Sequence, residues 1–266
     1  MKSIMLLAAI WAAAIATPAC AVGRIAQVTV YDRSEGRQLP VHWHEGRAWI
    51  AGKPGNEYRV SLRNRGNEEL LAVVSIDGVN VITGETANPA QSGYLLAALR
   101  RLDIAGWRKS LAQTAAFYFT ALPDSYAART GRPGEVGVIG IALFRKKPFA
   151  PLPPVGIAPL SQAESRKERA SAGAAGDARA SADAASGGNY EDAARLGTGH
   201  GRRETSPARY VEFERADQAP AETITLYYDS RPNLIARGVI REATPRLPNP
   251  FPGFVADPQA RRAPAS

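Results

Sequence analysis

The sequence predicts an all-β protein: an antiparallel β-sandwich of the Ig-like or jelly-roll-like kind, with short helices or none and one long disordered insertion. Many short segments either alternate apolar and polar residues or are apolar throughout, and turn-forming residues separate them. No segment repeats apolar residues at the spacing of a long amphipathic helix. One low-complexity stretch interrupts this pattern and lacks the large apolar residues that a core requires.

Residues 1–21 have the features of a secretory signal peptide. Lys2 supplies a basic start, an apolar run follows, and small residues around Cys20 offer a cleavage site. We therefore expect a periplasmic or secreted protein whose leader, with Cys20, is removed. A lipid anchor at Cys20 is a less favoured alternative, because Thr17 and Pro18 do not suit a lipoprotein signal; an uncleaved anchor is another. No later apolar run is long enough to cross a bilayer, so no transmembrane span is expected after the leader is removed.

The net charge and the cysteine count of the chain indicate which classes of partner and site fit it. The chain has 33 Lys and Arg against 25 Asp and Glu, a formal net charge of +8. An exported protein meets little nucleic acid, so we expect no nucleic-acid partner, and anionic lipid, lipopolysaccharide or acidic glycans fit the charge better. The alternative is an ordinary solvated basic surface, because no cluster reaches the density of a dedicated basic patch. Cys20 is the single cysteine, which excludes cysteine-based zinc sites and nucleophiles from the mature chain.

The first part of the sandwich is expected in residues 22–147. A short glycine-containing stretch at 65–68 separates two of the clearest strands and predicts a hairpin between them. Asp77 and Gly78 form a turn signal at the end of the second of these strands. The expected strands lie at residues 25–31, 48–51, 58–64, 70–76, 79–83, 94–96, 102–104, 115–120 and 136–144.

The remainder of the chain divides into three segments. Residues 148–205 open with prolines and continue in Ala, Ser and Gly, so we expect a disordered low-complexity insertion. Residues 206–243 contain three short strand-like runs, at 210–215, 223–228 and 234–240. Three such strands bury too little surface to be stable alone, so they are expected to complete the same sandwich. Residues 244–266 are expected to form a Pro-rich tail.

His42 and His44 are the nearest approach to a metal site. Residues two apart on a strand project from one face, so both imidazoles could contact one copper or zinc ion. Val41 and Trp43 would then lie on the buried face. The alternative is a solvent-facing pair before a turn, since the remaining histidine, His200, falls in the predicted insertion.

Two predicted loops combine arginines with aromatic residues, and loops on a rigid sheet commonly carry binding sites. The five candidate binding residues are Trp107, Arg108, Tyr126, Arg129 and Arg132. Tyr126, Arg129 and Arg132 could contact an acidic or carbohydrate group. The alternative is that these arginines brace their own loops through contacts with carboxylates and aromatic rings.

Enzyme motifs are scarce. The chain has no G-x-S-x-G sequence and only three histidines, which disfavours serine hydrolase chemistry. The glycines at 197, 199 and 201 resemble a phosphate loop only superficially, because no strand is predicted before them and no helix after them. Paired carboxylates for glycan cleavage stay open, because such acids need no fixed spacing. We predict no cofactor.

Three segments carry a resemblance: residues 73–84, residues 124–131 and residues 223–230. They are similar to a family of uncharacterised exported proteobacterial proteins. The resemblance implies export and a shared domain, and it implies no activity and no functional residues.

These observations favour a non-enzymatic, exported β-sandwich module. It would bind an envelope protein or an anionic envelope polymer. The alternatives are a glycan- or peptide-acting enzyme of unfamiliar type and a metal-binding periplasmic protein that uses His42 and His44.

Overall fold

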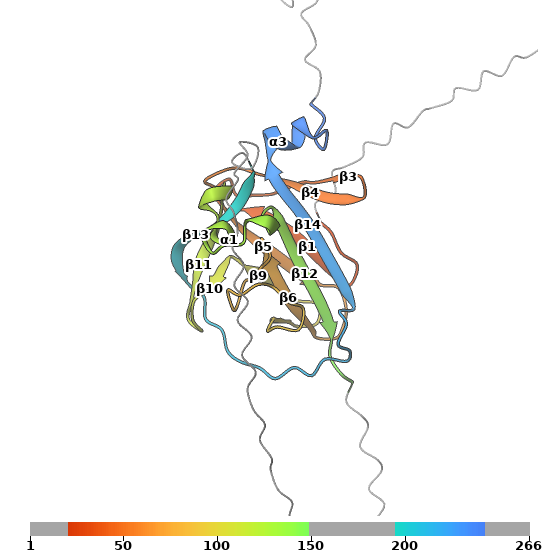
Figure 1. The fold of residues 1–266 in the computed structure, drawn as a ribbon. Coiled ribbons are helices and arrows are strands. Elements are labelled where there is room, and N and C mark those ends of the chain that lie inside the picture. The colour runs from red at the N-terminus through yellow and green to blue at the C-terminus, as the bar shows by residue number, and fades with distance from the viewer. Residues whose placement is uncertain (1–20, 149–194, 243–266) are drawn as a thin grey trace, which may run out of the picture.

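The computed structural model describes residues 21–148 and 195–242, and in it two β-sheets pack face to face around one hydrophobic core (Figure 1). The predicted all-β sandwich is therefore confirmed. Three predictions lie largely or wholly outside the described residues: the signal peptide with Cys20, residues 149–194 of the insertion, and the Pro-rich tail at 244–266.

The first sheet has the strand order β10-β11-β5-β1-β2, with β13 paired to β11 and β9 paired to β5. All of its pairings are antiparallel. Its strands are β1 (Ala26–Asp32), β2 (Arg37–Gln38), β5 (Glu57–Asn64), β9 (Arg101–Ile104), β10 (Gly106–Arg108), β11 (Gln113–Ala121) and β13 (Leu196–Thr205).

The second sheet has the order β3-β4-β14-β12-β6-β7, with β8 paired to β6. One pairing departs from the predicted antiparallel pattern, because β14 runs parallel to β4. Its strands are β3 (Val41–His44), β4 (Arg47–Gly52), β6 (Leu70–Ile76), β7 (Val79–Asn80), β8 (Tyr94–Leu96), β12 (Val138–Arg145) and β14 (Glu222–Ser230).

The described helices are short, as predicted. They are η1 (Leu122–Asp124), α1 (Tyr126–Arg129), η2 (Pro133–Glu135) and α3 (Arg231–Ala236). None of these is long and apolar enough to span a membrane.

Period-two alternation places the core between the sheets. Along β1 every second side chain is buried, from Ala26 to Asp32. Tyr58 of β5 stacks on Phe119 of β11 with ring centres 4.2 Å apart, and Phe119 in turn contacts Tyr228 of β14. Aromatic contacts of this kind stabilise beyond the area they bury, so this group joins the two sheets.

The connection after β5 differs from its prediction. The sequence predicted a hairpin at residues 65–68, but β5 belongs to the first sheet and β6 to the second, so the chain crosses the sandwich there. The buried side chain of Asn64 holds this crossing. Its Oδ1 accepts a hydrogen bond from the Gly66 N–H, and its Nδ2 donates to the carbonyl oxygens of Glu68 and Leu96. These bonds satisfy backbone groups that a hairpin ladder would otherwise pair.

The turn at Asp77 and Gly78 is confirmed. These two residues alone connect β6 to β7, since Ile76 pairs with Val79, and both have positive φ (52° and 70°). A two-residue hairpin with positive φ at both positions favours Asp-Gly. Asp77 therefore sits at a fixed point at one end of the second sheet.

Residues 196–205, predicted to be part of the disordered insertion, form β13 instead. Their three glycines suggested a loop, but Gly199 lies opposite Tyr118 of β11, and a Cβ at this glycine would lie 2.2 Å from the Tyr118 Cζ. The glycine thus leaves room for the aromatic ring to lie against the strand.

A Gly199→Ala variant is expected to lower the free energy of unfolding by about 1–3 kcal/mol, because the Tyr118 ring must move from its place on the sheet. Urea denaturation followed by circular dichroism measures this. Gly134→Ala is the matched control: a Cβ there meets no atom within 4 Å, and a change within about 0.5 kcal/mol is expected. Equal losses in the two variants would contradict the packing role of Gly199.

The predicted strand at 210–215 is also wrong. This segment makes one isolated bridge, between Lys146 and Arg215, and otherwise covers the outer face of the second sheet. The Arg215 guanidinium lies 4.0 Å from the centre of the Phe144 ring and donates to the carbonyl oxygens of Pro89 and Gln91. Phe213 packs on the same outward apolar cluster as Phe144. Phe213 and Arg215 therefore cover this cluster, whereas Tyr210 and Val211 are exposed.

The predicted strand at 223–228 is confirmed as β14, whereas the run at 234–240 begins as helix α3. Ser230 caps this helix by accepting a hydrogen bond from the Asn233 N–H, Pro232 lies in the first turn, and Gly238 follows the end with φ of +72°. A capping serine, an early proline and a late glycine are helix signals. We missed them because the following residues are mostly β-branched or apolar.

Candidate anion-binding surface

Trp107 does not lie in a loop, as the sequence suggested, but on strand β10, where it is buried. Its indole Nε1–H donates a hydrogen bond to the Gly199 carbonyl oxygen (3.1 Å), and its ring meets the Phe117 ring edge-on. This side chain supports the surface above it and does not contact solvent itself.

Arg108 and Arg132 brace the protein internally. The Arg108 guanidinium donates to the Ser206 carbonyl oxygen and lies over the Tyr94 ring. The Arg132 guanidinium donates to the carbonyl oxygen of Gly84 (3.2 Å) and to the Thr130 hydroxyl (2.9 Å). Arg108 thus contacts an aromatic ring, as the bracing alternative expects, whereas the printed contacts of Arg132 are a carbonyl oxygen and a hydroxyl group.

Tyr126 and Arg129 lie on α1, which Ser125 caps by accepting a hydrogen bond from the Ala128 N–H. The Tyr126 ring centre is 4.9 Å from that of Trp107 and 5.5 Å from that of His200. Arg129 is exposed at the last residue of the helix. The helix therefore places one half-buried ring and one exposed cation beside β13.

A β-bulge in β13 adds two further basic residues to this place. Between the pairs Phe117–His200 and Ala115–Arg203, β11 advances two residues while β13 advances three. An extra residue reverses the alternation of a strand locally. Phe117 and Ala115 share the inner face of the sheet, so His200 and Arg203 lie on the same side as each other. Without the bulge, residues three apart would face opposite sides.

Three cations surround His200. Partial burial lowers the pKa of His200, and the positive charges of Lys109, Arg129 and Arg203 lower it further. Among the described residues, no carboxylate contributes to raising it. The His200 Nε2 is buried and has no hydrogen-bond partner within the described part of the chain. We call this group, namely Lys109, Tyr126, Arg129, His200 and Arg203, the His200 surface.

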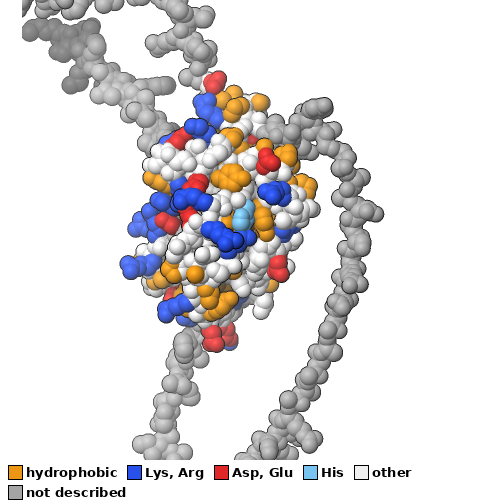
Figure 2. Space-filling view, turned by 90° about the vertical axis from the view of Figure 1, so that its left-hand side faces the viewer, with side chains coloured by type: hydrophobic (Ala, Val, Ile, Leu, Met, Phe, Trp, Pro, Cys, Tyr) orange, Lys and Arg blue, Asp and Glu red, His pale blue; other side chains and the backbone are white. Residues whose placement is uncertain are grey.

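Several other cations on the first sheet are paired with carboxylates. Arg33 and Arg202 contact Glu57 and Glu204 in a network with nitrogen–oxygen distances of 2.7–3.4 Å. By contrast, none of the three cations around His200 has an ion pair among residues 21–148 and 195–242. Figure 2 views the molecule from the β13 side and shows a histidine beside Lys and Arg side chains. Within the described residues, the positive charge at this place therefore has no compensating carboxylate.

Sequence reasoning found Tyr126 and Arg129 and missed the other members. His200 and Arg203 were assigned to the insertion, and Lys109 was not singled out from its basic neighbours. The charged residues Arg202, Arg203 and Glu204 gave no distinct signal, because the insertion before them also contains charged residues, as at 166–169. The bulge that aligns His200 with Arg203 had no sequence signal that we recognised.

His42 and His44 lie on edge strand β3, and both are half-buried. His44 Nε2 is 3.8 Å from a Glu45 carboxylate oxygen, and burial lowers the pKa of His42, with a smaller effect of Arg231. In the described ranges, no three His, Cys, Asp or Glu side chains are grouped to hold a metal ion. Trp43 was expected in the core but is 55% exposed, because β3 is an edge strand.

A chain of buried hydroxyl groups ends at Asp77. Tyr228 donates to Asp77 Oδ1 (2.6 Å), so the Thr198 hydroxyl must donate to Tyr228 (2.7 Å) and the Tyr58 hydroxyl to Thr198 (2.6 Å). Burial raises the pKa of Asp77 to about 6, although hydrogen bonds to its carboxylate oppose this shift. All four side chains are fully buried, so no substrate reaches them. The chain joins the two sheets and is structural.

No protein-family model matches the chain, and no curated protein or solved structure is significantly similar to it. Function is therefore argued from the geometry of the His200 surface.

Proposed function

We propose that this protein is an exported, non-enzymatic β-sandwich module that binds an anionic polymer of the cell envelope through the His200 surface. One observation carries the proposal. Lys109, Arg129 and Arg203 come from three separate segments, and they converge on one half-buried histidine without a carboxylate among their described neighbours.

The electrostatics favour an anion as the missing partner. Like charges that converge at a partly buried place raise the free energy of the folded state, and an anionic ligand would relieve this repulsion. Arginine guanidinium groups form paired hydrogen bonds with carboxylate, sulfate or phosphate oxygens. Arg129 and Arg203 are exposed, so both guanidinium groups are accessible to such a ligand.

The surroundings favour a polymer over a single ion. The cations are spread over the β10–β11 turn, the end of α1 and the bulge of β13, so they form an open surface and not a closed cage. The half-buried Tyr126 ring lies among them and offers an apolar face to a sugar ring or an acyl chain. Export, as expected from the leader, would bring such polymers within reach.

The double variant Arg129→Gln/Arg203→Gln tests the proposal. Each charge-assisted hydrogen bond contributes about 1.5–3 kcal/mol, so affinity for lipopolysaccharide vesicles at physiological salt should fall at least tenfold. Isothermal titration calorimetry measures it. The matched control is Arg63→Gln/Arg65→Gln, which removes the same charge from two exposed arginines. We expect the control to bind within about twofold of the wild type.

Three outcomes would contradict this function. An equal loss in both double variants would reduce the effect to general basicity. If the wild type bound neither polygalacturonate nor lipopolysaccharide vesicles, an anionic polymer would not be its ligand. Unchanged affinity in Arg129→Gln/Arg203→Gln, with the wild type binding, would place the contact on another face.

A further inference from the structure

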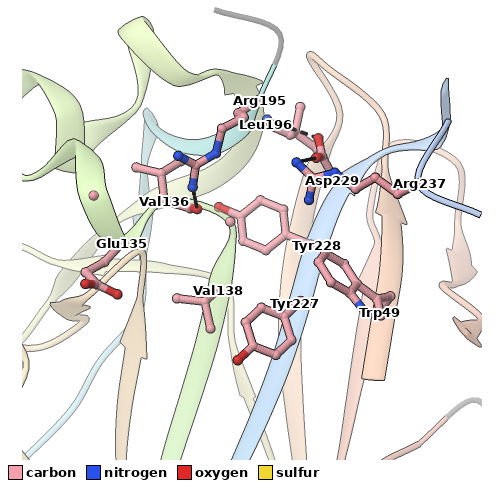
Figure 3. Close-up of a pocket in the computed structure, with 12 residues that line it drawn as sticks. Trp49, Glu135, Val136, Val138, Arg195, Leu196, Tyr227, Tyr228, Asp229 and Arg237 are labelled. Carbon is pink, nitrogen blue, oxygen red and sulfur yellow. Dashed lines mark hydrogen bonds and ion pairs between the residues drawn. The ribbon is translucent and has the colours of Figure 1, made fainter. Parts of the chain in front are cut away.

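A cavity of about 170 Å³ lies where β12 and β13 begin and β14 ends (Figure 3). Backbone of residues 134–138 forms one side. Trp49 of β4 and Tyr227 of β14 form the other, and Arg237, which follows α3, also lines it. Figure 3 shows the two rings next to each other, with Arg237 above them and Glu135 on the opposite side. No member of the His200 surface lines this cavity, and of the hydroxyl chain only Tyr228 does.

Strand register builds the aromatic wall. Trp49 and Tyr227 are direct partners in the parallel pair of β4 and β14, so their side chains share the outer face of the second sheet. Their ring centres are 5.0 Å apart, at an interplanar angle of 32°. Two half-buried rings side by side offer a π surface on which the C–H face of a sugar ring can pack.

Several groups on this wall are donors without an acceptor. The Trp49 Nε1–H is buried and has no hydrogen-bond partner within the described residues. Arg47 lies beside the cavity and does not line it: its guanidinium is 5.7 Å from the centre of the Tyr227 ring and makes no ion pair with a described residue. A buried donor without an acceptor is costly, so a ligand that fits here supplies acceptors.

Asp229, a buried acid that lines this cavity, already has hydrogen-bond and ion-pair partners. Asp229 is buried and accepts hydrogen bonds from the Ser230 N–H (2.7 Å) and the Asn233 side-chain amide (2.8 Å). It also forms an ion pair with Arg237 (3.4 Å), whose guanidinium lies 5.9 Å from the Trp49 ring centre. Asp229 therefore positions Arg237 against the aromatic wall, and the Arg237 side chain remains about half exposed.

Size limits the ligand. Pockets for drug-sized molecules measure roughly 300–1,000 Å³, so a cavity of about 170 Å³ admits a single ring-sized unit. The Trp49 and Tyr227 rings favour a ligand ring with a C–H face. The indole N–H and the arginine guanidinium groups favour a ligand with negatively charged oxygen acceptors. We infer that this pocket binds one sugar ring that carries a carboxylate, a uronic-acid unit, with its ring on Trp49 and Tyr227 and its carboxylate toward Arg47 or Arg237.

The Trp49 indole N–H reports binding directly. In a ¹H–¹⁵N spectrum of the wild-type protein titrated with galacturonic acid, the Trp49 indole signal should move as its N–H gains an acceptor. A Trp49→Phe variant assigns that signal. The Trp107 indole, already bonded to the Gly199 carbonyl oxygen, should stay in place and serves as the internal reference.

Two comparisons establish the chemistry of the ligand. Galactose, which has the same ring without the carboxylate, should bind at least tenfold more weakly than galacturonic acid. At least one of the variants Arg47→Gln and Arg237→Gln should bind galacturonic acid about tenfold more weakly, and Arg63→Gln, which changes an exposed arginine of the opposite sheet, should leave the affinity unchanged. Arg47 is exposed, so its variant is expected to fold.

Each alternative result would overturn the inference. If the Trp49 indole signal did not move in the presence of galacturonic acid, this cavity would not be its binding site. If galactose bound as tightly as galacturonic acid, the carboxylate would not contribute to recognition. If both Arg47→Gln and Arg237→Gln bound galacturonic acid as tightly as the wild type, neither arginine would contact the carboxylate. The variant Arg129→Gln/Arg203→Gln should show the wild-type response, so this site and the His200 surface can fail separately.

Discussion

An Asp77→Ala variant should lose about 3–5 kcal/mol of its free energy of unfolding at pH 7, a large part of the 5–15 kcal/mol typical of a domain. The Asp77 carboxylate accepts hydrogen bonds from the Tyr228 hydroxyl and from the backbone N–H groups of Gly137 and Thr198. Each buried donor left without an acceptor costs about 1–3 kcal/mol. Removal of a buried charge offsets part of that sum.

The loss should reach beyond the turn in which Asp77 lies. Thr198 belongs to β13 of the first sheet, whereas Gly137 and Tyr228 belong to the second sheet and its approach. Asp77 also anchors an edge strand, since the N–H of Thr198 has no partner strand on that side. We therefore expect β13 to detach from the second sheet when the carboxylate is removed.

Urea denaturation at pH 7 measures the effect, and hydrogen exchange of β13 amides locates it. Asp217→Ala is the matched control, because Asp217 is exposed and should change stability by about 0.5 kcal/mol or less. If Asp77→Ala and Asp217→Ala had the same stability, Asp77 would not be the link between the sheets.

The strands that sequence reasoning found are those whose burial follows their own alternation. β1 and β5 bury every second residue or more, and their apolar spacing shows it directly. β13 was missed because its buried positions after Leu196 are glycine and threonine, whose burial depends on partners such as Tyr118 and Asp77 and not on their own hydrophobicity. Tertiary partners, which a single sequence does not reveal, determine that strand.

The candidate surface shows the same division. Tyr126 and Arg129 were identified because they lie together on one short segment with mixed aromatic and basic character. His200, Arg203 and Lys109 join them only through strand pairing and a bulge, both of which depend on long-range register. Trp107 was chosen for its aromatic ring, but its neighbours on β10 and β11 place that ring in the core.

The buried carboxylate should also give the fold an unusual dependence on pH. Burial raises the pKa of Asp77 from 3.8 to about 6 in the folded protein. A group whose pKa is higher in the folded state binds its proton more tightly there, so its contribution to stability is complete below about pH 4 and is lost as the pH rises through about 6. A shift of about two pKa units corresponds to about 3 kcal/mol.

Other titratable groups change the stability of the fold with pH in the opposite direction. His42 and His200 have lowered pKa values, so their contributions to stability fall as the solution is acidified below about pH 6.5. Glu57 also has a lowered pKa, and its contribution falls below about pH 4.5. The difference between the wild type and Asp77→Asn removes these common terms. It isolates the carboxyl group between pH 4.5 and 7.

Between pH 4.5 and 7 we expect the wild type to lose about 2 kcal/mol relative to Asp77→Asn, as measured by urea denaturation at each pH. Where the asparagine variant does not fold, a carbon-13 titration of the wild-type Asp77 carboxyl group should show a midpoint near 6. A midpoint below 4 would mean that the Tyr228, Gly137 and Thr198 hydrogen bonds outweigh burial. In that case acid would weaken the junction between the sheets, because protonation would then remove the favoured form of its central acceptor.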